Sequence, residues 1–158
     1  MEGVEGRGAG RSLPEFNAAG DLPPGVHPAP FQEVIERFGS GTFQRVIVAS
    51  RLSRIYSIAV STGQVRRFIV FGSFVTAKPE PNDVDVFLLM EDSFAVRSLE
   101  GETRLLFDHT AADSRFGASI FWLRRQAAFG GEDVTVEHWQ IKRAGSRRGI
   151  IDIVREEP

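Results

Sequence analysis

The hydrophobic pattern along the chain changes near residue 30. Residues 1–29 hold many glycines and prolines and few large apolar side chains, which predicts a flexible N-terminal arm. From Pro30 onward, apolar residues recur at helical spacing in a short helix that ends at Gly39. The folded domain is therefore expected to occupy residues 30–158.

A second, longer helix is predicted over about residues 43–61, with Thr42 as its N-cap. One face of this helix is apolar and buries itself in the core. Three arginines lie around the rest of the helix and are predicted to form a solvated face. The apolar stripe consists of Val48, Leu52, Ile55, Tyr56 and Ala59, and the arginines are Arg45, Arg51 and Arg54.

After Gly63 the hydrophobic period changes from helical to extended. Two almost wholly apolar runs, 68–71 and 83–90, are typical of strands that are covered on both faces. The remaining expectations are a helical segment over 93–109 with a break near Gly101, a strand over 118–123, and a hairpin built from 134–141 and 149–154. This order predicts an α/β or α+β domain with a mixed β-sheet and helices mainly on one side.

The composition indicates which classes of protein the chain can belong to. A chain of 158 residues with 42% hydrophobic and 25% charged residues fits one globular core. The net charge of -2 gives no general attraction to nucleic acid or anionic membranes. The absence of cysteine excludes disulfides and thiolate chemistry, and no apolar stretch approaches the ~20 residues that span a bilayer. A soluble cytoplasmic protein is expected.

Two aspartates at the start of the second strand are the first candidates for chemistry. Asp83 and Asp85 alternate along a strand, so both side chains lie on one face. Two neighbouring carboxylates repel each other, and burying them unpaired is costly. A hard divalent cation, Mg²⁺ or Mn²⁺, would neutralise both. The spacing therefore predicts a metal site at Asp83 and Asp85.

The turn after the first strand is a candidate phosphate site. Gly72 lets the backbone approach a ligand closely, and Ser73 adds a hydroxyl beside the free N–H groups of a starting helical turn. Lys78, in the spacer that follows, is a further candidate for binding phosphate, although an exposed loop lysine needs no such role. Nine residues separate Ser73 from Asp83. A phosphate site beside a metal site is what metal-assisted phosphoryl transfer requires.

This combination of strand, Gly-Ser, spacer and Asp-x-Asp in a second strand resembles the DNA polymerase beta-like nucleotidyltransferase superfamily. The small size is similar to its minimal nucleotidyltransferase branch, which is often paired with helical partners in toxin–antitoxin loci. The stretch from Gly72 to Val86 and both ends of the chain also resemble an uncharacterised bacterial domain family on that fold. The resemblance implies that Gly72 and Ser73 hold nucleoside triphosphate and that Asp83 and Asp85 hold Mg²⁺. An acceptor hydroxyl would then take a nucleotidyl group and release pyrophosphate.

The chain departs from this superfamily at one position. The resemblance implies a third carboxylate on a neighbouring strand, but Ser119 stands where that acid is expected. A serine cannot act as a carboxylate base. Asp108, Asp113 and Asp152 are possible substitutes, and the pattern favours Asp152 because it interrupts an apolar strand.

Three functions follow from these observations. The first is a nucleotidyltransferase-like protein that binds Mg²⁺ and a nucleoside triphosphate and transfers NMP to a protein or RNA acceptor. The second, supported by Ser119, is a catalytically silent nucleotide-binding or antitoxin-like partner protein. The third is a structural use of the fold without nucleotide. The sequence leaves the choice between transfer and binding alone open.

Overall fold

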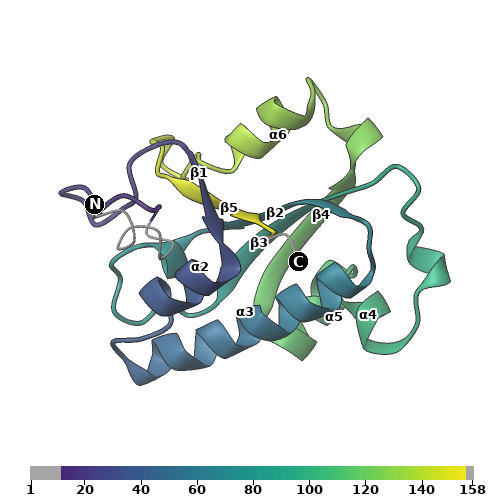
Figure 1. The fold of residues 1–158 in the computed structure, drawn as a ribbon, viewed down its shortest axis with the longest axis horizontal. Coiled ribbons are helices and arrows are strands. Elements are labelled where there is room, and N and C mark those ends of the chain that lie inside the picture. Colours follow the sequence, from purple (N-terminus) through teal and green to yellow (C-terminus); the bar gives the residue numbers. More distant parts are fainter. Residues whose placement is uncertain (1–11, 156–158) are drawn as a thin grey trace, which may run out of the picture.

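The chain folds around one five-stranded mixed β-sheet, seen nearly edge-on in Figure 1. The structure, a computed structural model, describes residues 12–155. The strand order is β1-β5-β2-β3-β4, in which β1 runs parallel to β5, β3 runs parallel to β4, and the other neighbours are antiparallel. The strands are β1 (Val26–Pro30), β2 (Val65–Phe71), β3 (Val84–Met90), β4 (Ala118–Arg124) and β5 (Ile150–Val154).

Of the five α-helices within residues 12–155, four lie on one face of the sheet and the fifth lies on the other (Figure 1). This confirms the predicted α+β architecture with a mixed sheet and helices mainly on one side. The first four are α2 (Phe31–Phe38), α3 (Phe43–Ser61), α4 (Gly101–Leu105) and α5 (His109–Phe116), and the fifth is α6 (Glu132–His138). Single 3-10 turns occupy Ser73–Val75, Val96–Ser98 and Arg125–Ala127.

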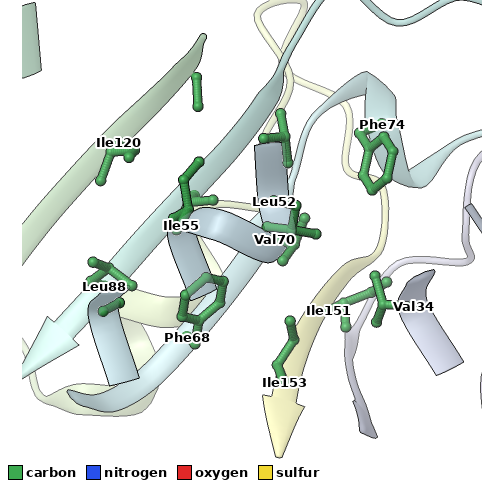
Figure 2. Close-up of a cluster of buried hydrophobic side chains, with 14 of the residues drawn as sticks. Val34, Leu52, Ile55, Phe68, Val70, Phe74, Leu88, Ile120, Ile151 and Ile153 are labelled. Atoms are coloured by element: carbon green, nitrogen blue, oxygen red, sulfur yellow. The ribbon is translucent and has the colours of Figure 1, made fainter. Parts of the chain in front are cut away.

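The larger core lies between α3 and the sheet (Figure 2). Leu52 and Ile55 of α3 pack with side chains that alternate along the central strands, and all of them are buried. The strand residues at the intervening positions form a second, smaller cluster under α6. The first face carries Phe68, Val70, Val86 and Leu88, and the second carries Ile69, Phe87, Leu89 and Ile150. Alternation along β2, β3 and β5 therefore builds two apolar layers on the two faces of one sheet.

Several predicted helix ends are confirmed. Thr42 caps α3, and its hydroxyl accepts a hydrogen bond from the Arg45 backbone N–H. Gly39 ends α2, where an added Cβ would lie 2.6 Å from the Ile35 carbonyl oxygen. The region 93–109 contains less α-helix than predicted. Within it, α4 covers only Gly101–Leu105, and α5 begins at His109 and continues beyond the predicted end. Asp108 caps α5 by accepting from the Ala111 N–H.

The predicted C-terminal hairpin is wrong. Residues 132–138 form α6, and β5 pairs with β1 and β2 on its two sides. Two acidic residues in the first turn favour a helix at this place, since they complement its dipole. A strand that is buried between two others needs partners from distant parts of the chain, which local periodicity cannot reveal. Only an isolated bridge between Ile141 and Arg147 resembles a hairpin.

The N-terminal segment also differs from the predicted boundary at residue 30. Of the predicted arm, residues 1–11 lie outside the described part of the chain, whereas residues 12–29 pack on the domain. Leu22 is wholly buried, and Val26–Pro30 form an edge strand. The Glu33 side chain accepts hydrogen bonds from the Ser12 and Leu13 backbone N–H groups. Backbone hydrogen bonds to distant segments thus order a stretch whose composition resembles a linker.

No helix within residues 12–155 is long and apolar enough to cross a membrane.

Candidate functional site

The candidate site begins with a row of three residues across the sheet. Phe71 of β2 is paired in register with Asp85 of β3, which in turn is paired with Ser119 of β4. All three lie on the face opposite α3, because their neighbours in sequence face the larger core. Asp83 lies just before β3 and interacts with the same serine. The two aspartates and the serine are therefore brought together as the sequence predicted.

Gly72 closes one side of this row. Its φ of 84° lies in the region that favours glycine, and a Cβ added there would overlap the Oδ2 atom of Asp85. The 3-10 turn Ser73–Val75 follows at once, and the first N–H groups of such a turn have no partner within it. The Gly-Ser turn thus presents backbone donors directly beside the Asp85 carboxylate.

The two carboxylates share an unfavourable environment. Burial, followed by the negative charge of Asp83, raises the pKa of Asp85 from 3.8 to about 6. Burial and the charge of Asp113 likewise raise the pKa of Asp83, although Arg51 opposes this. A hydrogen bond from Ser119 favours the charged form of both. No described lysine or arginine forms an ion pair within 4.0 Å of either aspartate. The pair is therefore best satisfied by an added cation.

A cleft of about 360 Å³ opens over Gly72, Asp85 and Ser119. The loop between α6 and β5 forms its basic wall with three cations, Lys142, Arg143 and Arg148. Three aromatic rings also line it, namely Phe71, Phe121 and Trp139. We refer to this hollow as the acidic–basic cleft. One partly buried acid in the same hollow as three cations suits a ligand that carries phosphates and a metal ion together.

The comparisons with known proteins identify the family. Residues 14–154 match the family described as "Family of unknown function (DUF6932)". The chain belongs to DUF6932. No curated protein and no solved structure matches it. Nothing in these comparisons links DUF6932 to the nucleotidyltransferase superfamily that the Gly-Ser and Asp-x-Asp motifs resemble, so that resemblance remains a prediction.

An N-terminal acid holds the basic wall of the DUF6932 cleft in place. Asp21 is 8% exposed, and its carboxylate lies 3.3 Å from the Lys142 Nζ and 3.7 Å from an Arg148 guanidinium nitrogen. Arg148 also faces Asp85, whose pKa its charge lowers. The Gly149 N–H donates to the Leu22 carbonyl, which anchors the same loop. The segment predicted as a flexible arm therefore positions half of the site.

The spacer between the two motifs is fixed by α3. Arg45 uses all five of its N–H donors on backbone carbonyls, those of Phe38, Phe74, Thr76 and twice Lys78. It is only 6% exposed, so its prediction as part of a solvated face is wrong. The signal was present, since Arg45 continues the buried stripe three positions before Val48. Thr42 and Gln44 add hydrogen bonds to the carbonyls of Pro79 and Pro81.

The other predicted residues divide into two groups. Gly72 lies directly against Asp85 and lines the cleft with it, and Ser73 follows Gly72 in the 3-10 turn. Ser73, Asp83 and the exposed Lys78 are not among the described residues that line the cleft. Asp152 does not replace the missing acid, because it pairs with Arg67 at 2.8 Å beside β2. Asp108 is used as a helix cap. Asp113 alone among the three substitutes is close enough to raise the pKa of Asp83.

The basic loop and the aromatic side chains are parts of the cleft that no local pattern predicted. In the DUF6932 structure Arg143, Arg148 and Trp139 line the cleft. Their distance from the motif along the chain gave no sign of this proximity.

The donor set fits a divalent metal that is shared with a ligand. Within residues 12–155 no group of three acidic or histidine side chains could hold a metal ion alone. Two carboxylates are available, Asp83 and Asp85. Mg²⁺ is commonly bound by one or two carboxylates with the remaining positions filled by water and substrate phosphates. The residues present therefore fit Mg²⁺ that arrives with a phosphate ligand better than a permanently bound ion.

Proposed function

We propose that the acidic–basic cleft binds a nucleoside triphosphate together with Mg²⁺ or Mn²⁺. The observation that carries this proposal is the arrangement of charges across one cleft. Asp85 and Gly72 line the same hollow as Lys142, Arg143 and Arg148, and Ser73 follows Gly72 directly. The metal supplies charge neutralisation between the carboxylates and the phosphates. The basic wall and the backbone donors at Ser73 hold the phosphate oxygens.

The reaction class that fits such a site is nucleotidyl transfer. An acceptor hydroxyl oxygen on protein or RNA would bond to the α-phosphorus, and its proton would pass to solvent or a nearby base. The bond from the α-phosphorus to the bridging oxygen would break, and pyrophosphate would leave. Asp83 and Asp85 would orient the metal-bound phosphates, which contributes to rate through positioning.

A second candidate function is a catalytically silent nucleotide-binding protein that acts through a partner, as an antitoxin-like protein does. Ser119 favours it, because the position paired with Asp85 carries a hydroxyl in place of a carboxylate. Binding rests on two metal ligands and several donors, whereas transfer also needs the acceptor hydroxyl to be activated. The two candidates share the same ligand and differ in the chemical step.

The test uses purified protein with each α-labelled nucleoside triphosphate and Mg²⁺ or Mn²⁺, in the presence of lysate proteins and RNA. We expect metal-dependent binding that falls at least about 10-fold in Asp83→Asn and in Asp85→Asn, because each loses a charge-assisted metal contact. Asp133→Asn is the control, since its side chain is 87% exposed and lies outside the cleft. Label transfer that depends on Asp83 identifies the enzyme, and binding without transfer identifies the silent protein. Absence of any metal-dependent nucleotide binding would contradict both.

A further inference from the structure

A second hollow adjoins the acidic–basic cleft along β4. Its volume is about 450 Å³, and its lining includes Phe87, Phe107, His109, Phe121, Trp122 and Trp139. We call it the aromatic groove. It shares Phe121 and Trp139 with the acidic–basic cleft, so the two hollows are continuous at these side chains.

The shared rings form a partly exposed aromatic platform. The Phe121 ring centroid lies 5.1 Å from that of Trp139 and 4.8 Å from that of His109. Trp139 in turn stacks on the buried Phe87 at 5.0 Å. Phe121 is nevertheless 37% exposed. Rings that are held by neighbours and still exposed are suited to stacking with a planar ligand, because little side-chain freedom is lost on binding.

The distance from the aspartates to the platform suits a nucleoside. Phe121 follows Ser119 by two residues on the same face of β4, and Phe87 follows Asp85 in the same way on β3. Two residues of a strand advance by about 6.6 Å. A ribose separates the phosphate of a nucleotide from its base by a comparable span. A triphosphate held at Asp85 and Arg148 therefore has a stacking surface within reach of its own base.

Two polar groups at the groove give it chemical selectivity. The His109 Nδ1 lies 3.1 Å from the Ile120 carbonyl oxygen, which can only accept, so Nδ1 carries the proton. With the proton on Nδ1, Nε2 is an acceptor. The Trp139 Nε1 is buried and has no hydrogen-bond partner within residues 12–155. Such an unsatisfied donor is uncommon in a native fold, and it belongs to a residue that lines both hollows.

We infer that the aromatic groove binds the nucleobase of the triphosphate whose phosphates occupy the acidic–basic cleft. The base stacks on Phe121 and Trp139, and His109 accepts a hydrogen bond from an exocyclic amino group. Adenine carries such a group and uracil does not. This inference rests on the proposed function, because it assigns the base-binding part of the same nucleotide site.

The experiment compares binding of ATP, UTP and inorganic tripolyphosphate, each with Mg²⁺, by calorimetry on the full chain. We expect ATP to bind about 10- to 100-fold more tightly than tripolyphosphate, as stacking of one base contributes. Phe121→Ala should weaken ATP binding much more than tripolyphosphate binding, so that most of this difference is lost. His109→Phe, which keeps a ring, should reduce the preference for ATP over UTP severalfold. Phe129→Ala is the matched control, because Phe129 is 93% exposed and lies outside the groove.

The outcomes separate the two proposals. Tripolyphosphate that binds as tightly as ATP in the wild type overturns the base site while the phosphate and metal site stands. Binding of neither ligand overturns the proposed function and the base site with it. If short oligoribonucleotides require Phe121 while ATP gains nothing over tripolyphosphate, the groove takes a base of RNA instead, and the inference is wrong. Phe121→Leu and thermal unfolding by circular dichroism exclude loss of folding as the cause.

Discussion

Two aspartates on the same face of the sheet, Asp85 and Asp152, differ in how the fold treats them. Asp152 accepts a hydrogen bond from the Arg67 Nε at 2.8 Å, and Arg67 also contacts Glu132 at the start of α6. Asp85 has the Ser119 hydroxyl, a more distant Arg148, and a second acid, Asp83, beside it. Burial raises the pKa of both carboxyl groups. The strongest neighbouring charge is the carboxylate of Asp83 at Asp85, which raises the pKa further, and the guanidinium of Arg67 at Asp152, which lowers it.

The difference separates a structural acid from a candidate functional one. At Asp152 a guanidinium compensates the charge, and the resulting ion pairs tie β2 and β5 to α6. At Asp85 the fold keeps a poorly compensated carboxylate packed directly against Gly72, where any Cβ would overlap the carboxylate. Proteins retain such local costs where a ligand offsets them. Substitutions around Asp152 and around Asp85 test this comparison.

The largest expected effect is on the structural side. Arg67→Met leaves Asp152 and Glu132 without their shared cation, and we expect the free energy of unfolding to fall by about 3 kcal/mol, as when one partner of a buried pair is removed. Urea unfolding measures it. Arg66→Met is the control, because Arg66 is more exposed and pairs with Glu91 and Glu132 at the surface, where the loss should be below about 1 kcal/mol. Equal losses of unfolding free energy in Arg67→Met and Arg66→Met would contradict a structural role of the pair between Arg67 and Asp152.

The next effect is at Gly72. Gly72→Ala forces a strained φ and pushes the Asp85 carboxylate aside, so we expect a loss of about 2 to 3 kcal/mol together with loss of metal-dependent nucleotide binding. Gly41→Ala is the matched control, since Gly41 has a φ of 102° with no atom within 4 Å of an added Cβ. It should lose only about 1 kcal/mol and bind normally. Retained binding in Gly72→Ala would argue against a ligand between Gly72 and Asp85.

Replacement of Asp85 by Asn is expected to have a smaller effect, and it should stabilise the protein. Its pKa of about 6 in the folded state exceeds the ordinary 3.8, so between these values the folded state holds a proton that the unfolded state has lost. Stability from this group is present at low pH and is lost as pH rises through 6. Asp85→Asn removes the ionisable group and with it this loss of stability. The variant should therefore have a free energy of unfolding about 1 kcal/mol higher than the wild type above pH 7, a value that allows for screening of the charge by solvent.

The pH profile provides the check on that prediction. The difference in Tm between Asp85→Asn and the wild type, measured without metal, should shrink as pH falls below 6 and vanish near pH 4. Asp83 contributes with the same sign, because its pKa is also raised. A mutant that is less stable than the wild type at pH 8 would mean that Asp85 is already compensated, as Asp152 is.

The smallest effect sharpens the role of Ser119. Ser119→Asp places a third carboxylate beside Asp85 and should lower stability slightly without metal. In millimolar Mg²⁺ the extra ligand should tighten metal binding, so the stabilisation by Mg²⁺ should grow by up to about 1 kcal/mol. Ser114→Asp, at an exposed position of α5, controls for added charge. Equal Mg²⁺ responses in the two variants would place the metal away from Ser119.

Local patterns in the sequence were sufficient for much of the fold. The apolar runs became β2, β3 and β4, and Thr42 and Gly39 limited the helices as predicted. The same patterns misread Val134 and Val136 as a strand, because two apolar residues at alternate positions also fit one short helix. They missed Arg45, whose charge hid its place in a buried stripe.

The acidic half of the candidate site could be predicted from local sequence, since Gly72, Ser73, Asp83 and Asp85 lie in one turn and in or next to two adjacent strands. Local periodicity is enough to put two alternating carboxylates on one face and to put a glycine at the end of the strand beside them. The basic half depends on the three-dimensional fold. Asp21, Lys142 and Arg148 come from segments more than a hundred residues apart and meet through β1 and β5 at the sheet edge. Such contacts depend on which strands pair, which is settled by the packing of the whole domain.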